Sequence, residues 1–567
     1  AVLSAPNFGE GFTATGNQGP PNFGFGASTG TCTSGLNLYN PPAGGFSEDC
    51  LEAIRADLKN RGEMRQTIVE SNVSGSLFNL PAGEVGVALG ASYRELQYQF
   101  DNDTLTTAGR SFQDQALGIY PSGNVDAGYN VSELYGELLV PILADIPAIQ
   151  NFSLELGGRM SDYSTTGTSY TYKILGDWEV NDWLRFRGGY NRAERAPNIA
   201  ELYLAAQQTF GGNSAGDPCS LANPLSFSAN QTGDQYDGGN ANGARVQAVC
   251  RIMMEQSGNP TADDDYYNGV QSSSTGGFAF PTTVGNPNLK PETANTWTAG
   301  IVINSPMTSG PLSRLRLSVD WFDIHVKDAI GEQTVGVALQ QCYDPALNPA
   351  WAGSDTDVAN SQFCQNVPRN ATGALGNVKR TYVNNGEFEL QGIDAQIDWA
   401  MDAGPGTVNL NIVANYQLKF ESTSLAGILP MVDYVGTLGT GENGLNTGVY
   451  EYRILTTLGY AVGPATVSLQ WQHLPSIEDA TEAQTGEPTP TTGYPSYNLF
   501  NLNGTFAMTD NVNLRFGVDN LFNKRPPLGN VNTAADPALG QLSGGGYNAT
   551  FYDTNGRRFY FGANMKF

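Results

Sequence analysis

The chain has 567 residues, including 68 Gly, 26 Tyr and 26 Phe, and only 15% of them are charged, well below the roughly 25% usual in soluble domains. No run of about 18 apolar residues is present, which excludes a membrane-spanning helix but not a membrane β-barrel, whose strands alternate. With 29 Lys and Arg against 55 Asp and Glu, the net charge of −26 argues against nucleic acid as a partner and against a basic helix lying on an anionic membrane.

Fifteen segments alternate apolar and polar residues with the period of two that is typical of strands. Gly392, in "ELQGIDAQIDW", is a candidate β-bulge because two apolar residues break the alternation around it. In chain order the expected strands are 65–79, 84–100, 129–141, 151–163, 168–180, 183–193, 293–304, 314–328, 381–401, 405–421, 450–461, 464–473, 496–508, 512–522 and 557–567.

The connections alternate between short turns and long loops. Segments such as 181–182 and 462–463 are tight turns, whereas 194–292 and 329–380 span 99 and 52 residues. Long structureless loops would be unusual in a compact soluble domain, but outer-membrane barrels have short periplasmic turns and long external loops. The pattern therefore predicts an all-β fold, a transmembrane antiparallel β-barrel with long extracellular loops and a periplasmic C-terminus.

The polar face of the strands indicates which solvent each face meets. A soluble barrel fills its interior with apolar side chains, but here the candidate inner positions carry Arg, Glu, Asp, Asn, Gln and Gly. In "NFSLELGGRM", Phe152, Leu154 and Leu156 alternate with polar residues. The apolar face therefore points outward to lipid, and we expect Phe567 at the periplasmic girdle.

An odd number of strands cannot close a bacterial barrel, which has an even number. We therefore expect the remaining strands to come from sequence outside this chain. Residues 1–64 precede a strand that runs toward a short turn, so they are expected to form an extracellular segment, and 65–567 the C-terminal part of the barrel.

Six cysteines lie in the long connecting segments, two in each. Six cysteines allow fifteen pairings, but membership of the same loop favours disulfides between Cys32 and Cys50, Cys219 and Cys250, and Cys342 and Cys364. Their spacing fits no zinc pattern, and the periplasm through which the loops pass is oxidising. Each bond would stabilise its loop by about 3 kcal/mol.

Several stretches resemble one family, the TonB-dependent outer-membrane receptors. "ERAPNIAELY" (194–203) resembles the "R-x-P-x-x-x-E-L-Y" segment before a large external loop, and "GNPNLKPETANTWTAGI" (285–301) resembles the "N-P-x-L-K-P-E" motif that leads into the next strand. "LRLSVDWFDIHVKDAI", "NNGEFELQGIDAQIDW" and "FGVDNLFNKRPP" resemble later strands. The ending "RRFYFGANMKF" resembles the C-terminal assembly signal, which implies that role for Phe559, Phe561 and Phe567.

The resemblance implies a barrel of 22 strands with an N-terminal plug domain, in the Gram-negative outer membrane. Neither a plug nor a TonB-contacting segment is recognised in these residues, and seven strands are also unaccounted for, since 22 − 15 = 7. The implied partners are outer-membrane lipid, an N-terminal polypeptide with the plug and remaining strands, the TonB energy-coupling complex that acts through that plug, and an imported solute.

Catalytic and metal sites have weak support. "GNSAG" around Ser214 fits a hydrolase pattern, but it lies in a Gly- and Asn-rich loop, and the only two histidines, His325 and His473, lie in distant strands. No enzyme activity and no cofactor is therefore expected. The acidic run at 263–265 (Asp263, Asp264 and Asp265) could bind calcium in a loop, although a solvated loop tip is the simpler interpretation.

Aromatic residues mixed with amides in the large loop and beside it suit a ligand with apolar faces and hydroxyl edges, such as an oligosaccharide. The same residues could instead pack the loops. The candidate ligand-binding residues are Tyr203, Phe210, Tyr236, Tyr266, Tyr267 and Phe278, with Phe280 beside them.

Two functions remain open. The first is the barrel portion of a TonB-dependent receptor that takes up a large scarce solute: an oligosaccharide, siderophore, cobalamin or peptide. The low Lys and Arg content disfavours strongly anionic ferric siderophores. The alternative is a surface receptor or scaffold that binds a partner protein through disulfide-tied loops, with little transport.

Overall fold

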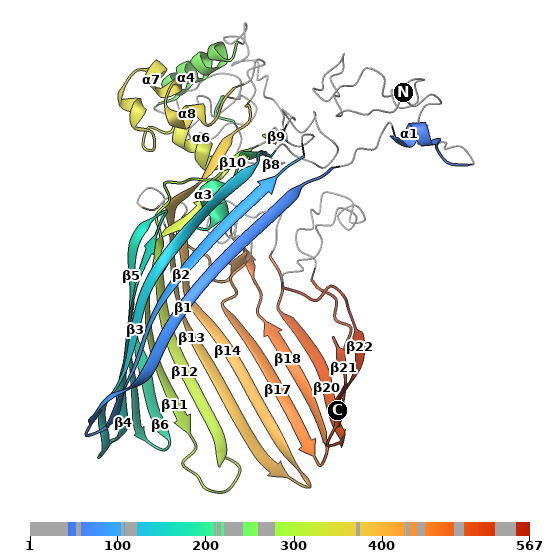
Figure 1. The fold of residues 1–567 in the computed structure, drawn as a ribbon. Coiled ribbons are helices and arrows are strands. Elements are labelled where there is room, and N and C mark those ends of the chain that lie inside the picture. Colours follow the sequence, from blue (N-terminus) through green and yellow to red (C-terminus); the bar gives the residue numbers. More distant parts are fainter. Residues whose placement is uncertain are drawn as a thin grey trace.

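The computed structural model describes residues 44–52, 58–103, 107, 122–208, 211–212, 217–219, 242–258, 278–279, 281–369, 375–423, 426, 431–438, 448–480, 493–527 and 551–566. The main body is one curved sheet in which fifteen long strands follow one another in chain order (Figure 1). Each is antiparallel to the next. The predicted β-fold and all fifteen predicted strands are confirmed.

These strands run two to five residues further than predicted at several ends. They are β1 (Arg61–Leu80), β2 (Gly83–Asp101), β3 (Val125–Ile146), β4 (Ile149–Tyr163), β5 (Gly167–Asn181), β6 (Leu184–Arg195), β11 (Glu292–Asn304), β12 (Arg314–Glu332), β13 (Lys379–Ala403), β14 (Gly406–Thr423), β17 (Tyr452–Val462), β18 (Ala465–Leu474), β20 (Tyr497–Thr509), β21 (Val512–Asp519) and β22 (Arg558–Met565).

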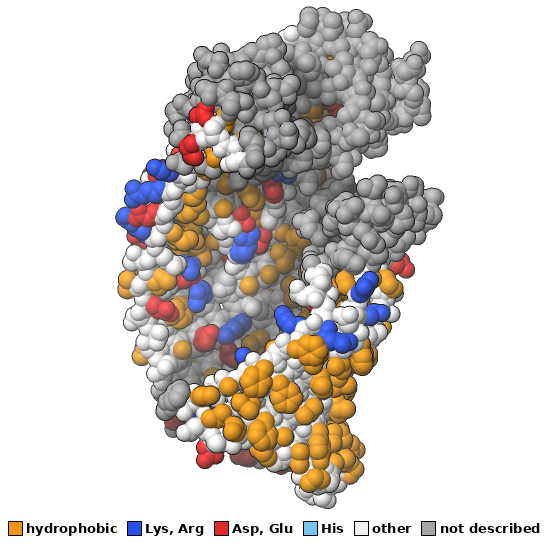
Figure 2. Space-filling view, turned by 90° about the vertical axis from the view of Figure 1, so that its right-hand side faces the viewer, with side chains coloured by type: hydrophobic (Ala, Val, Ile, Leu, Met, Phe, Trp, Pro, Cys, Tyr) orange, Lys and Arg blue, Asp and Glu red, His pale blue; other side chains and the backbone are white. Residues whose placement is uncertain are grey.

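The strand register places alternate residues on two contrasting faces. We call the face that carries Phe516 and Phe561, paired in register, the outer face, and the face that carries Arg187 and Asp320 the inner face. Phe559 and Phe561 are 73% and 72% exposed on the outer face. Figure 2 shows hydrophobic side chains gathered over the C-terminal strands nearest the viewer, with charged side chains in the hollow behind them. This is the distribution of a wall with lipid on one side and water on the other.

Short turns lie at one end of the sheet and long connections at the other (Figure 1), except that the turn 164–166 between β4 and β5 lies at the end with the long connections. Gly404 and Gly463 begin two of the two-residue turns with φ of +62° and +53°, a left-handed conformation that glycine adopts without steric penalty. The end with the long connections also carries the helices of the described residues. The alternation of short and long connections read from the sequence is therefore present in the structure.

The sequence analysis treated the long connections as structureless, but in the structure they contain short helices and strands. They contain α1 (Glu48–Glu52), α3 (Ile199–Tyr203), α4 (Gly243–Gln256), α6 (Val335–Tyr343), the 3-10 helix η2 (Pro349–Ala352), α7 (Asp355–Ala359) and α8 (Gln362–Gln365). Short strands also occur there: β7 (Gln207–Gln208), β8 (Gly211–Gly212), β9 (Phe278–Ala279), β10 (Thr282–Val284), β15 (Val432–Asp433), β16 (Thr437–Leu438) and β19 (Glu478–Asp479).

Two details differ from the sequence reading. β1 begins at Arg61, four residues inside the segment assigned to an extracellular loop. The register shift expected near Gly392 is present, but the extra residue is Leu418 on the partner strand β14, because Gln391 pairs with Lys419 and Gly392 with Gln417.

Within the described residues, the two outermost strands each pair along one edge only. β1 pairs with β2, and β22 pairs with β21. No helix in this part of the chain is long and apolar enough to cross a membrane.

Candidate functional site

Charged side chains on the inner face pair with others one or two strands away. Arg187 on β6 donates two hydrogen bonds to Asp320 on β12, at 2.7 and 2.6 Å, although 133 residues separate the two. Lys173 on β5 contacts Glu137 at 2.9 Å and Glu155 at 2.5 Å. Partly exposed pairs of this kind each contribute at most about 1 kcal/mol. Their main effect is to line the wall with charges that are already neutralised.

Glycine gives these side chains room to cross the sheet. Gly300 on β11 is paired in register with both Arg187 and Asp320, and a Cβ atom placed on it would lie 2.0 Å from Oδ1 of Asp320. A Cβ atom on Gly90 would lie 2.2 Å from the ring of Tyr135 in the same way. Glycine at these two positions is therefore required by the inner-face contacts of the neighbouring strands.

The two receptor-like motifs meet at the end of the sheet that carries the long connections. Arg195 forms paired hydrogen bonds with Glu292, at 2.7 and 2.8 Å, and with Glu201, at 2.9 and 3.0 Å. Asn198 caps α3 by accepting from the backbone of Ala200 and Glu201, and Glu201 accepts from the Asn198 backbone to complete a capping box. The motifs therefore fix α3 against the sheet rather than present a catalytic group.

α3 forms one wall of a cavity of about 640 Å³ at this end of the inner face. Tyr98 and Phe100, both on β2, form another wall with rings 6.4 Å apart and inclined by only 12°. Tyr203, the last residue of α3, lines the cavity. We call this space the vestibule cavity. It is lined by Leu58, Asn60, Met64, Tyr98, Phe100, Asn102, Ser122, Gly123, Val125, Ile199, Ala200, Tyr203, Leu204, Ala205 and Gln207.

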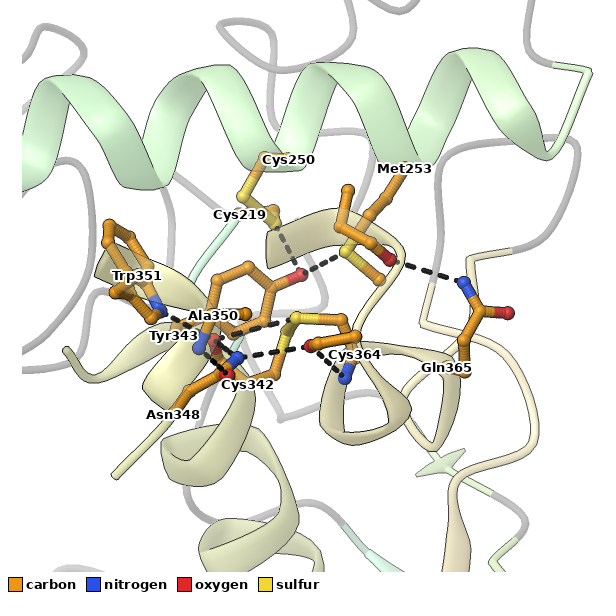
Figure 3. The surroundings of a disulfide bond; sticks show 12 residues. Cys219, Cys250, Met253, Cys342, Tyr343, Asn348, Ala350, Trp351, Cys364 and Gln365 are labelled. Carbon is orange, nitrogen blue, oxygen red and sulfur yellow. Dashed lines mark hydrogen bonds between the residues drawn. A yellow bond between two sulfur atoms is a disulfide. The ribbon is translucent and has the colours of Figure 1, made fainter. Parts of the chain in front are cut away.

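Above the sheet, α4, α6, η2, α7 and α8 pack into a small helical cap (Figure 1). Its core joins two connections that are distant in sequence. In Figure 3 the ring of Tyr343, from α6, lies between the disulfides of the two connections, and its hydroxyl lies 3.4 Å from the sulfur of Met253 on α4. The buried core is Cys219, Val246, Val249, Cys250, Met253, Met254, Ala338, Leu339, Cys342, Tyr343, Trp351, Val358, Ala359, Cys364, Val367 and Val378.

A buried ion pair completes this core. The side chain of Arg369 is fully buried and donates to both carboxylate oxygens of Asp217, at 2.5 and 2.7 Å, and to the Tyr343 hydroxyl at 3.1 Å. Burial alone would lower the pKa of the Arg369 guanidinium, but the adjacent Asp217 carboxylate raises it, so Arg369 stays charged. The pair locks the segment after α8 to the turn that carries Cys219.

Two of the three expected disulfides are present. Cys219 bonds Cys250, and Cys342 bonds Cys364. Cys50 is also disulfide-bonded, but Cys32 lies outside the described residues, so their pairing stays a prediction.

A second cluster of aromatic residues lies between the connections that precede β17, β20 and β22. The hydroxyls of Tyr450 and Tyr552 are 2.6 Å apart, and Tyr497 and Ile477 are buried beside them. Burial and the Tyr450 contact raise the pKa of Tyr552 well above its usual range. The sequence did not predict this cluster, since its members come from separate segments, at strand ends and in connections, that meet only in the folded chain.

Of the other ligand-binding candidates, Phe278 forms part of β9, but its side chain is not described. Phe210, Tyr236, Tyr266, Tyr267 and Phe280 lie outside the described residues, as do Ser214, Asp263, Asp264, Asp265 and Phe567. Among the residues that are described, no group of His, Cys, Asp and Glu side chains could hold a metal ion.

Sequence reasoning missed Tyr98 and Phe100 as cavity residues. The signal was present in "YRELQYQF", where both aromatics fall on the face opposite Tyr93 and therefore on the inner side. An aromatic pair on a polar strand face is unusual enough to have marked a site. The pairing of Arg369 with Asp217 had no such signal, because 152 residues separate them.

The family model "TonB dependent receptor-like, beta-barrel" matches residues 4–242 and 255–521. A search of curated proteins finds no match.

Solved structures resemble the chain in fold. The siderophore receptor PirA from Acinetobacter baumannii is 16% identical, with a TM-score of 0.50, 90% of this chain covered and 55% of that one. A mutant of the ferric enterobactin receptor PfeA from Pseudomonas aeruginosa is 15% identical, with a TM-score of 0.54 and coverages of 89% and 54%. The chain thus spans about half the length of these receptors. Since the family model covers most of its residues, the chain belongs to the β-barrel family of TonB-dependent outer-membrane receptors, which are transporters rather than enzymes.

Proposed function

We propose that this chain forms the greater part of the wall and vestibule of an energy-coupled outer-membrane importer. The observation that carries the proposal is the fifteen-stranded antiparallel wall, apolar on its outer face and lined by paired charges on its inner face. Such a wall surrounds a wet lumen in lipid. The solute is large and scarce, and belongs to the oligosaccharides, siderophores, cobalamins or peptides.

The strand number and the family of the chain support the following partners. An N-terminal polypeptide supplies about seven strands, which complete the 22-stranded plugged class, and a plug domain whose rearrangement by TonB admits the solute. The C-terminus is periplasmic, and residues 1–64 and the connections 194–292 and 329–380 are extracellular. The short turns at one end of the sheet and the helical cap at the other support this orientation.

The test is growth on scarce solutes. Cells that make the complete receptor are supplied with ferric siderophores, cobalamin, oligosaccharides or peptides as the sole source of iron, cobalamin or carbon. We expect one solute class to support growth only when both the receptor and TonB are present. Equal growth without TonB on every solute that requires the receptor would reject energy-coupled import.

A second function has a specific observation in its favour. The helical cap is held by two disulfides and the buried Arg369–Asp217 pair, so it is a rigid surface suited to binding a partner protein with little ordering cost. On this proposal the chain is a surface receptor or scaffold. Deleting the cap would then abolish partner binding, whereas uptake of a small solute would not depend on the receptor.

A further inference from the structure

The lining of the vestibule cavity differs in charge from the rest of the inner face. None of its described lining residues is Lys, Arg, His, Asp or Glu. By contrast, a cavity of about 590 Å³ further down the same wall is lined by Asp177, Arg185, Arg187 and Asp320, among others. The neutrality is therefore local to the vestibule, where a solute would first meet the inner face.

Unpartnered polar groups remain in this neutral lining. Within the part of the chain that the structure describes, the hydroxyls of Tyr98 and Tyr203 have no hydrogen-bond partner. The side-chain oxygen of Asn60 accepts from the backbone of Asp103 at 2.9 Å, which leaves the Asn60 amide nitrogen free to donate. Two hydroxyls and an amide thus border an apolar surface formed by Phe100, Met64 and their neighbours.

These features together define a ligand. The rings of Tyr98 and Phe100 are nearly parallel and both line the cavity, and aromatic lining suits an apolar face on the solute. The free hydroxyls and the amide suit polar groups at the edge of that face. An anionic solute would find no cation in this lining, and the chain as a whole has a net charge of −26, which repels anions.

We propose that the vestibule cavity binds an uncharged oligosaccharide, whose sugar rings stack on Tyr98, Phe100 and Tyr203 while their hydroxyl groups bond the tyrosine hydroxyls and Asn60. This inference rests on the proposed import function and specifies its solute class. The proposed solute is not the one in the name of the ferric enterobactin receptor. That receptor shares the fold of this chain, and a shared fold does not imply a shared ligand.

The test uses the complete receptor purified with all its polypeptides. Binding is measured by calorimetry with maltohexaose, cellohexaose, xylohexaose and mannohexaose as neutral probes, and with oligogalacturonate and ferric tris-catecholate as anionic probes. We expect at least one neutral probe to bind with an affinity that ionic strength does not change, and the anionic probes not to compete with it.

Variants connect the binding to this cavity. Phe100→Ala and Tyr203→Ala should each weaken the affinity for the neutral probe about tenfold, the size of one lost aromatic contact. Tyr203→Phe, which keeps the ring, should weaken it less. Tyr93→Ala is the matched control, because Tyr93 lies on the outer face of the same strand, and it should leave the affinity unchanged.

The outcomes separate this inference from the import proposal. Failure of all neutral probes to bind, or an equal effect of Phe100→Ala and Tyr93→Ala, would overturn the oligosaccharide site. TonB-dependent uptake of ferric tris-catecholate in that case would leave the importer intact and refute only the solute class. Binding of a neutral probe that needs the cavity residues, without TonB-dependent uptake, would support the site and refute import.

Discussion

The Arg195 guanidinium donates two hydrogen bonds, of 2.7 and 2.8 Å, to the Glu292 carboxylate, which lies 97 positions later in the sequence. The same Glu292 carboxylate accepts from the backbone of Ile330 at 2.5 Å, and Arg195 also holds Glu201 of α3. The contact therefore joins β6, α3, β11 and the end of β12. It explains why the two receptor-like motifs lie on either side of the largest connection.

Arg195→Ala should release α3 from the sheet. The change leaves Glu201 and Glu292 without their cation, although their side chains are only 12% and 16% exposed. We expect a loss of about 1–2 kcal/mol, seen as a lower temperature for the loss of heat-modifiable folded protein in detergent. Arg61→Ala is the control, since that side chain is 79% exposed. Equal melting of the two variants would contradict a structural role for Arg195.

Periodicity in the sequence predicted the strands of the fold but not its helices. The alternation in segments such as 512–522 located every long strand, because a period of two survives whatever the strands pair with. The helices were missed although α4 carries the apolar spacing of an amphipathic helix at Val246, Val249, Cys250 and Met253. The Gly- and Asn-rich sequence around these helices is typical of loops, so the whole connections were interpreted as loops.

The candidate site was less predictable for a physical reason. Tyr203 was identified because it lies in a loop rich in aromatics. Tyr98 and Phe100, which line the same cavity, lie more than 100 residues earlier, and only the fold brings the three residues to one site. The Arg187–Asp320 pair likewise requires knowledge that β11 lies between β6 and β12. Contacts of this range follow from topology, which composition and spacing do not specify.

Arg369→Leu should disrupt the helical cap. It leaves the Asp217 carboxylate buried without a cation, which costs about 3–5 kcal/mol in comparable sites. We expect rapid proteolysis within 242–258 and 333–369, the cap segments outside the barrel strands, under non-reducing conditions and with the barrel intact. Replacing both Arg369 and Asp217 by Leu should restore much of the protection, because no unpaired charge then remains. If the single and double variants were cleaved equally fast, the ion pair would not hold the cap.

The cap should also lose stability in alkali. Burial raises the pKa of the Tyr343 hydroxyl above its ordinary value of about 10. The folded cap then keeps a proton that the unfolded cap releases, so this stability is fully present below pH ~10 and falls as the pH rises above it. We expect protease protection of the cap to decline in that range, and more weakly in Tyr343→Phe. A tyrosinate titration in which Tyr343 ionises near its ordinary pKa would contradict this.

A charge on the outer face should impair assembly. Phe561 is 72% exposed and lies opposite Phe516 in register. Phe561→Arg places a cation in lipid, at about 2–4 kcal/mol near the bilayer midplane, and should reduce the folded, heat-modifiable form in the outer membrane. Asn564→Arg, on the inner face of the same strand, should assemble normally. Phe567→Ala should also reduce assembly, as the terminal sequence pattern predicts.

The edges of the sheet lead to the last prediction. Within the described residues, the backbone of β1 pairs only with β2 and that of β22 only with β21, and in hydrocarbon each unsatisfied backbone group costs several kcal/mol. Outer-face side chains of β1 are correspondingly exposed, with Val69 at 64% and Val73 at 66%. We expect these edges to pair with about seven further strands, the number that completes the plugged class.

Cysteine cross-linking and native mass measurement would test this pairing. With the native cysteines left in their disulfides, a cysteine at Val73 or Phe559 should form cross-links to strands outside residues 61–565 in the assembled receptor. A cysteine at Val319, in the middle of the sheet, should form none, because β12 is already paired on both sides. Direct cross-linking of Val73 to Phe559 would show that β1 and β22 close the barrel by themselves, which would defeat both the additional strands and the importer that depends on them.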